Sequence, residues 1–146
     1  MPPPFCLLLA ETLGGRLATM SGDLDYIRDL REKFLTELKD ALPDGCWRET
    51  VPAEDASPYI AHLLFSGGAQ TYQGAILTRI MAKFGASIAS GSACDAETGT
   101  PSRVLTAMGL SRDEAYSAVR VSFFDSNTPD EASELARLLA RAVREY

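Results

Sequence analysis

The sequence predicts a single α+β domain over residues 1–146, in which helices cover one small mixed or antiparallel sheet. Three observations lead to this class. The chain has 146 residues, the length of one ordinary domain. Its composition, 46% apolar and 23% charged, is typical of a globular protein. Short strand-like segments also alternate with helical ones along the chain, without an internal repeat or a low-complexity stretch.

The first third of the chain has a helical pattern. Residues 5–19 are spaced as in a helix, although the neighbouring Gly14 and Gly15 are a pair that often marks a bend or a break. From Ser21 onward the apolar residues recur at helical spacing and predict a long amphipathic helix: Leu24, Ile27, Phe34, Leu35, Leu38 and Leu42. The Pro-Asp-Gly sequence at 43–45 predicts where this helix ends.

The middle of the chain reads as strand, strand, helix, strand. Residues 46–51 and 59–65 are short and apolar enough for strands. A helix follows, with Gly85 placed as its C-terminal cap and four apolar residues on one face: Ile76, Leu77, Ile80 and Met81. Residues 86–89 then predict a buried strand that runs directly into Ser-Gly-Ser-Ala-Cys at 90–94.

In the last third of the chain, capping residues predict where the helices begin and end. Thr100 and Pro101 make a suitable start, and Gly109 a suitable end, for a short helix. Capping boxes begin two further helices, and they pair Ser111 with Glu114 and Thr128 with Glu131. The last helix turns a broad apolar face inward and closes the chain.

Charge and cysteine content exclude several classes of function. The formal net charge is -6 without a basic cluster, which argues against nucleic acid and anionic membranes as partners. The N-terminal apolar run 5–10 is too short to span a bilayer and lacks the basic start of a signal peptide. Three cysteines (Cys6, Cys46 and Cys94) and the single His62 argue against a disulfide scaffold and against a metal site. We therefore expect a cytoplasmic protein without a bound metal.

Cys94 is the candidate nucleophile. Cys6 lies in an apolar run, as buried structural cysteines do, whereas Cys94 follows a strand and enters a loop of small residues. Accessibility and a low thiol pKa make a cysteine reactive. Asp95 and Glu97 would raise the pKa of the Cys94 thiol if they lie close to it. The alternative is an incidental surface thiol.

Arg120 is the second candidate, because it stands in an apolar strand. Residues 118–124 alternate, with Arg120 and Ser122 on one side and three apolar residues on the other: Val119, Val121 and Phe123. The guanidinium could bind the carboxylate of a small substrate. The alternative is a solvated arginine whose stem covers apolar surface.

His62 lies among apolar residues of a predicted strand. There a half-buried structural histidine is more common than a general base. A hydrolase dyad of Cys94 and His62 remains as a less favoured alternative.

Several linked motifs add a family resemblance. Residues 89–94 read A-S-G-S-A-C, 100–105 read T-P-S-R-V-L, 107–110 read A-M-G-L and 119–122 read V-R-V-S. In order and spacing they resemble the C-terminal part of group I (NifS- and IscS-like) cysteine desulfurases of the class V aminotransferase family. The active-site loop of that group reads S-G-S-A-C. The resemblance covers about the last third of a full-length member.

The resemblance implies both a fold and a function. The fold would be the small C-terminal domain of fold-type I pyridoxal-phosphate (PLP) enzymes. The activity would be that of a transferase that converts L-cysteine to L-alanine with PLP and holds the sulfur as a persulfide on Cys94. Arg120 matches the arginine that pairs with the substrate carboxylate. The acceptor would be an iron-sulfur cluster scaffold or a sulfur carrier protein.

Departures from the family pattern imply an incomplete site. The Schiff-base lysine and the residues that hold the PLP ring belong to a large N-terminal domain in the family, and Lys33, Lys39 and Lys83 match none of its motifs. We therefore assign no cofactor-binding residue and expect the chain to need a separate PLP-binding large domain. The alternative is a non-catalytic module that accepts sulfur or docks on a partner. An exposed apolar patch would indicate a chain that acts with a partner, and a polar surface an independent protein.

Overall fold

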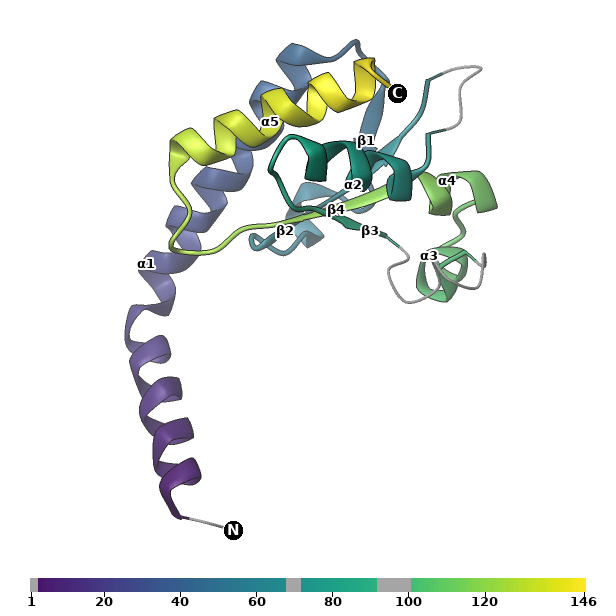
Figure 1. Cartoon of the computed structure of the whole chain (residues 1–146). Helices are drawn as coiled ribbons and strands as arrows, with labels where there is room; N and C mark the ends of the chain where they lie inside the picture. The colour runs from purple at the N-terminus through teal and green to yellow at the C-terminus, as the bar shows by residue number, and fades with distance from the viewer. Residues whose placement is uncertain (1–2, 68–71, 92–100) are drawn as a thin grey trace.

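A four-stranded antiparallel sheet forms the centre of the chain (Figure 1). The computed structural model describes residues 3–67, 72–91 and 101–146. The strands are β1 (Trp47–Glu49), β2 (Ile60–Phe65), β3 (Ala89–Ser90) and β4 (Ala118–Ser122). They lie in the order β1-β2-β4-β3, and each neighbouring pair is antiparallel. The predicted α+β class is thus confirmed.

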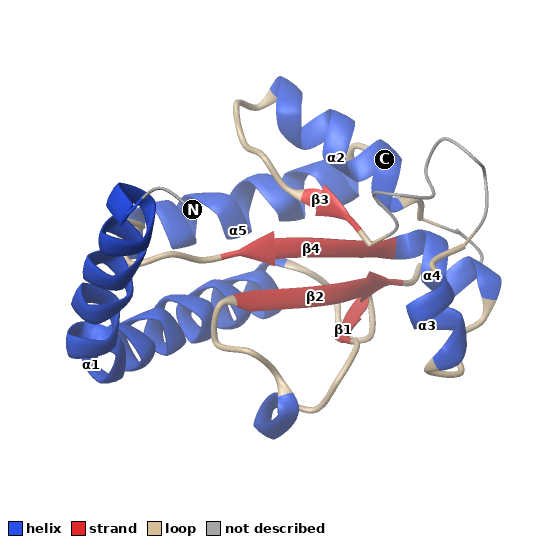
Figure 2. Cartoon of the chain, turned by 90° about the horizontal axis from the view of Figure 1, so that it is seen from below, coloured by secondary structure: helices blue, strands red, loops and turns tan. Residues whose placement is uncertain are grey.

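The longest helices lie on one side of this sheet. The helices are α1 (Pro3–Ala41), the short 3-10 helix η1 (Ala53–Asp55), α2 (Gly74–Lys83), α3 (Arg103–Ala107), α4 (Arg112–Ser117) and α5 (Pro129–Arg144). Figure 1 shows α5 and α2 above β2 and β4, with the second half of α1 behind α5. Figure 2 shows the opposite face, where β2 and β4 lie in front of α5. We call these the covered face and the open face.

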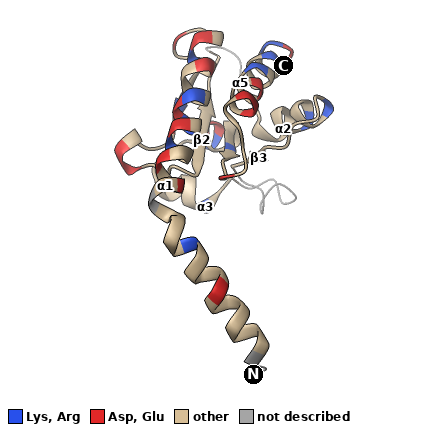
Figure 3. Cartoon of the chain, turned by 90° about the vertical axis from the view of Figure 1, so that its left-hand side faces the viewer, with Lys and Arg blue, Asp and Glu red and all other residues tan. Residues whose placement is uncertain are grey.

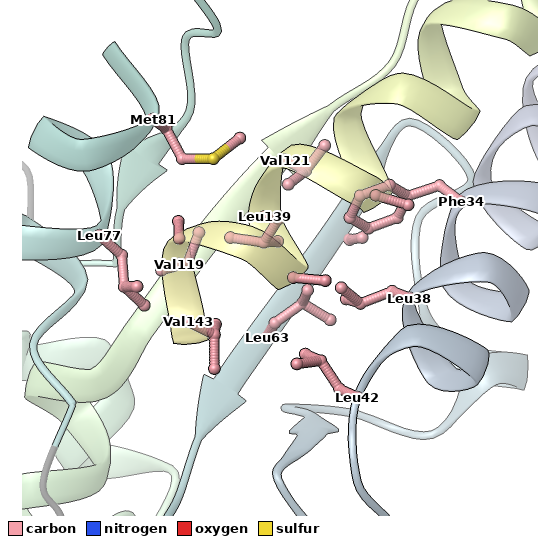
Figure 4. Packing of buried hydrophobic residues seen from close by; sticks show 14 of the residues in the cluster. Phe34, Leu38, Leu42, Leu63, Leu77, Met81, Val119, Val121, Leu139 and Val143 are labelled. Atoms are coloured by element: carbon pink, nitrogen blue, oxygen red, sulfur yellow. The ribbon is translucent and has the colours of Figure 1, made fainter. Parts of the chain in front are cut away.

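Alternation along the strands builds the core on the covered face. Leu63 of β2 lies opposite Val119 of β4, and Ala61 lies opposite Val121. These side chains pack against α5, α1 and α2 (Figure 4). The ring of Phe34 meets the ring of Phe123 edge to face at 5.6 Å between centroids. The inward positions predicted for the alternating strand and for the last helix are confirmed.

A second contact fixes α1 to the sheet. Arg31 is buried on α1, and its Nε donates to the carbonyl oxygen of Ile60 at 3.0 Å. The same guanidinium forms an ion pair with Glu49 of β1. A buried arginine needs such partners, because an unpaired charge there would cost several kcal/mol, roughly 3–5.

α1 runs without interruption through Gly14 and Gly15, so the bend or break that this pair often marks does not interrupt the helix. A glycine costs a helix only about 1 kcal/mol relative to alanine, which a 39-residue helix tolerates. The helix ends at Ala41, as the Pro-Asp-Gly sequence predicts. The expectation that Cys6 is a buried structural cysteine is wrong, because this half of α1 projects beyond the sheet and Cys6 is exposed.

Several element boundaries differ from the prediction. β1 is shorter than the predicted 46–51, and β2 begins one residue later than residue 59. β3 begins at Ala89 rather than at residue 86, because the N–H of Ala86 still donates to the α2 carbonyl of Met81. Gly85, at φ 81°, makes that helix end possible, as predicted. α3 begins at Arg103, with Ser102 as its N-cap, two residues later than a start at Pro101; Thr100 lies outside the described residues.

Both predicted capping boxes are present. The Ser111 and Thr128 side chains accept the N–H groups of Glu114 and Glu131, whose carboxylates accept the cap N–H groups in return. Within the described residues, no helix combines the length and the hydropathy needed to cross a membrane.

The Phe34 ring should be a main source of stability. We expect Phe34→Ala to lower the free energy of unfolding by about 3–5 kcal/mol, since it removes a buried aromatic ring and leaves a cavity. Urea unfolding followed by circular dichroism measures this loss. Val104→Ala is the matched control on an exposed side chain (67% exposed), with an expected change below about 0.5 kcal/mol. Equal losses in the two variants would contradict the placement of the core.

Candidate functional site

Arg120 lies in the middle of the open face. It is exposed on β4 between the buried Val119 and Val121, as the alternation predicts. Its register partners are His62 on β2 and Ala89 on β3. Among the described residues, none makes a hydrogen bond or an ion pair with the Arg120 guanidinium. This group is therefore available to a carboxylate that approaches the open face.

His62 lies beside Arg120 on the same face, because residues directly opposite each other on neighbouring strands point to the same side. Thr50 Oγ1 is 2.5 Å from His62 Nδ1 and donates to the His62 carbonyl oxygen at 3.2 Å. The Thr50 hydroxyl therefore contacts both the ring and the carbonyl oxygen of His62. The predicted half-buried histidine is confirmed. Sequence reasoning missed Thr50, since only the pairing of neighbouring strands brings it to the ring.

Burial and charge both disfavour an imidazolium at this position. Desolvation lowers the pKa of His62 below its ordinary value, and the positive charge of Arg120 lowers it further. The ring is therefore neutral near pH 7, and the positive charge at this part of the face belongs to Arg120.

Gly91 connects this face to the segment that carries Cys94. Its N–H donates to the carbonyl oxygen of Ala118 at 2.8 Å, next to the β3–β4 ladder. A Cβ built on Gly91 would lie 2.4 Å from the Cβ of Ala118 and 3.3 Å from His62 Nε2. Only glycine fits without a shift of its neighbours. Cys94 itself, with Asp95 and Glu97, lies outside the described residues.

The described residues do not fit a complete PLP site. All three lysines lie on helices rather than on the open face: Lys33 and Lys39 on α1, and Lys83 at the end of α2. Lys33 forms an ion pair with Glu37 at 2.9 Å. A Schiff base facing Arg120 would need a lysine from elsewhere. Within the described ranges, no three His, Cys, Asp or Glu side chains gather as metal ligands would.

Comparison with known proteins identifies relatives. No protein-family model matches the chain. "Cysteine desulfurase IscS" of Acinetobacter baumannii (strain AYE) is 30% identical over 125 residues, which cover 86% of this chain and 29% of that protein. "Cysteine desulfurase, mitosomal" of Trachipleistophora hominis is 27% identical over 144 residues, or 99% of this chain and 32% of its own length. The chain thus spans about three tenths of the length of these curated relatives.

Solved structures show the same fold. A NifS-like protein superposes with a TM-score of 0.69 at 19% identity, over 89% of this chain and 30% of its own. The NifS-like protein from Rickettsia africae ESF-5 gives a TM-score of 0.67 at 19% identity, over the same shares. The fold is therefore that of a part of the NifS-like proteins. With the sequence relatives, this makes the chain a homologue of the NifS- and IscS-type cysteine desulfurases that corresponds to a fragment of their length.

The only histidine of the chain allows a direct test of the Arg120–His62 contact. We expect NMR titration of the imidazole to give a pKa below the ordinary 6.5, and Arg120→Gln to move that pKa upward. Arg120→Lys keeps the charge and should leave the pKa low. Arg137→Gln, an exposed position on α5, should change nothing.

The lowered pKa of His62 also predicts how the free energy of unfolding changes with pH. Because folding lowers the pKa of His62, the unfolded chain takes up the proton first as pH falls below 6.5. His62 thus stabilises the fold above that pH, and the contribution is lost on acidification. His62→Gln should flatten the loss of stability between pH 7 and 5. An unchanged slope in urea unfolding would contradict this.

Proposed function

We propose that this chain is the small domain of a PLP-dependent cysteine desulfurase. Cys94 carries the sulfur, and Arg120 binds the substrate carboxylate. The observation that carries the proposal is sequence homology to cysteine desulfurases over nearly the whole chain. The exposed position of Arg120, on the face from which the chain enters the Cys94 segment, agrees with it. Residues 1–146 then form one domain of the enzyme.

Each residue has a defined part in the proposed reaction. Arg120 pairs with the carboxylate of L-cysteine, which fixes the direction of its side chain. The Cys94 thiolate bonds to the substrate sulfur as the carbon–sulfur bond breaks. The electron pair of that bond stays with the substrate carbon, which takes up a proton, so that L-alanine leaves and a persulfide remains on Cys94. Cys94 follows Gly91 by three residues, a length of chain that spans at most about 11 Å. The persulfide then passes its outer sulfur to an iron-sulfur scaffold or a sulfur carrier protein.

The PLP and its lysine would come from a separate large domain. PLP supplies the electron sink that labilises the substrate carbon–sulfur bond. The open face is the surface on which such a domain would complete the site, because Arg120 is exposed there beside His62. Exposed apolar residues on α1 also favour a chain that acts with a partner over an independent protein. A cytoplasmic location is part of the proposal, on the ground that the cysteine content argues against a disulfide scaffold.

The second candidate function is a non-catalytic module that receives sulfur from another enzyme. The positions of Lys33, Lys39 and Lys83 favour it, since none faces Arg120. In this case Cys94 would still accept a persulfide sulfur, but Arg120 would have no part in substrate binding.

Sulfide release separates an independent enzyme from a sulfur-carrying domain. We expect the purified chain, with PLP, L-cysteine and a dithiol reductant, to release no sulfide above that of the Cys94→Ser control. Release that depends on Cys94 would show that the chain builds a working site alone, against the proposed incompleteness.

Sulfur loading tests the proposed role of Cys94 itself. A full-length desulfurase, the Acinetobacter baumannii IscS, is incubated with L-cysteine and an excess of this chain. Mass spectrometry should show one added sulfur atom on the peptide of Cys94. The exposed Cys6 is the internal control and should gain none. Equal loading of Cys6, or no loading of Cys94, would count against a sulfur-carrying function of either kind.

A further inference from the structure

Three polar side chains form a row across the open face. Thr50 directly follows β1, His62 lies on β2 and Arg120 lies on β4, and strand pairing places them side by side. The row ends at β3, where the small Ala89 lies opposite Arg120. The proposed function uses only Arg120 of this row, so His62 and Thr50 have no part in it yet.

The register brings the His62 and Arg120 side chains close together. The N–H of Phe123 donates to the carbonyl oxygen of Tyr59 at 2.8 Å, which makes these two residues a hydrogen-bonded pair of the antiparallel ladder. Such pairs alternate with non-hydrogen-bonded pairs. His62 and Arg120 lie three positions further along and form a non-hydrogen-bonded pair. In such a pair the Cα atoms are only about 4.5 Å apart, and the side chains come closest.

Thr50 holds the imidazole of His62 from one side. Its Oγ1 lies 2.5 Å from Nδ1, and this contact leaves the other ring nitrogen, Nε2, directed away from β1. A hydroxyl both donates and accepts hydrogen bonds. Thr50 therefore keeps its contact whether Nδ1 carries a proton or a lone pair. Nε2 can then carry a proton either in the neutral ring or in the imidazolium.

On the other side of the ring, Nε2 lies beside Gly91. A Cβ built on Gly91 would be 3.3 Å from Nε2, so a side chain at this position would crowd the nitrogen. Among the described residues, none hydrogen-bonds to Nε2 or to the Arg120 guanidinium. Two hydrogen-bonding groups, one of them charged, thus lie next to each other and are available to a ligand.

Arg120 is the described charge that acts on His62. Burial and Arg120 together account for the lowered pKa of the imidazole. Arg48 of β1 points to the same face, but its guanidinium pairs with Glu114 of α4 at 2.7 Å. Glu49 of β1 points to the covered face, where it pairs with α1. Neither of these carboxylates balances the charge of Arg120, which is left to a ligand.

We propose that His62 is the second half of the carboxylate site, in which its Nε2–H and the Arg120 guanidinium each bind one oxygen of the same carboxylate. A carboxylate has two oxygens and accepts hydrogen bonds from two separate donors at about 2.8 Å each. Thr50 is the positioning residue that keeps Nε2 directed at the ligand. This inference rests on the proposed role of Arg120 in substrate binding and adds a residue to it.

A carboxylate site accounts for this arrangement better than a purely structural histidine does. A structural histidine would use both ring nitrogens within the fold, whereas His62 uses Nδ1 alone among the described residues. The positive charge of Arg120 disfavours a proton on the ring, and a carboxylate bound between the two groups reverses that effect. Carboxylate binding and proton uptake by His62 must therefore favour each other.

This linkage gives a direct test in the full chain, because its single histidine gives one imidazole signal in NMR spectra. The pKa of His62 is measured in about 200 mM sodium acetate and in sodium chloride of equal ionic strength, so that screening is the same. We expect acetate to raise this pKa by about 0.5, which is a roughly threefold tighter binding of the proton. An equal pKa in the two salts would overturn the proposal.

Substitutions separate the two halves of the site. Arg120→Gln should remove most of the rise that acetate causes, since the carboxylate loses its charged partner. Arg137→Gln on α5 is the matched control and should keep the full rise. The Nε signal of Arg120 reports acetate binding independently of the imidazole. At pH 6, His62→Leu should weaken the binding seen at that signal by about threefold, the same factor by linkage. Circular dichroism verifies that each variant is folded.

A pair of variants tests the positioning role of Thr50. Thr50→Val keeps the shape of the side chain but removes the hydroxyl, and it should lose at least about half of the rise in the His62 pKa that acetate causes. Thr50→Ser keeps the hydroxyl and should restore that rise. Equal losses in the two variants would show that Thr50 only packs there, against its role in directing Nε2.

The outcomes separate this inference from the proposed function. Acetate that shifts the Arg120 signal but leaves the pKa of His62 unchanged would overturn the role of His62, while the role of Arg120 would stand. Sulfur loading of Cys94 is measured without acetate and does not depend on His62. Failure of the proposed function is therefore seen in that experiment, whatever the imidazole titration gives.

Discussion

The burial of one face of the sheet is the constraint on which the rest of the structure depends. β2 and β4 place their apolar residues on the covered face, and four strands cannot bury that face by themselves. α5 and the second half of α1 cover it together, with Phe34 and Leu139 both fully buried. Arg31 also links α1 to the sheet, through an ion pair with Glu49 and a hydrogen bond to the β2 backbone.

Because of this burial, the residues that stabilise the fold and the candidate site residues lie on opposite faces of β2 and β4. Because side chains alternate along β4, the residues next to Arg120 build the core while Arg120 itself points to the open face. A change of Arg120 therefore removes a charge and little packing. Within the described ranges, one end of the open face is covered, where Leu64 and Ala118 pack against Leu105 of α3 and Ala115 of α4.

Among the described residues, two surfaces are exposed: the open face around Arg120 and the projecting half of α1. A domain that normally contacts others has such surfaces. This agrees with relatives that are about three times as long as the matched region. The two surfaces differ in chemistry, since the open face presents Arg120 and His62 whereas the projecting half of α1 carries only Glu11 and Arg16 as charged residues (Figure 3). They therefore suit different partners.

Local signals predicted most of the elements. The capping boxes at Ser111 and Thr128 are interactions within four residues, and so the sequence locates them well. The alternation around Arg120 predicted its exposed position for the same reason. The start of β3 was missed by three residues, because the N–H of Ala86 still donates to the carbonyl oxygen of Met81 in α2. The motif around Cys94 indicated the family, which the relatives bear out, while its role stays a proposal.

The sequence by itself determined the spacing of apolar residues in each element, the helix caps and the resemblance to relatives. All three depend only on the order of residues along the chain. Tertiary structure alone decided which half of α1 is covered, because the same apolar spacing continues through both halves and only the position of α5 and the sheet separates them. It also decided that Thr50, His62 and Arg120 meet. These residues are far apart in the chain, and only strand pairing brings them together.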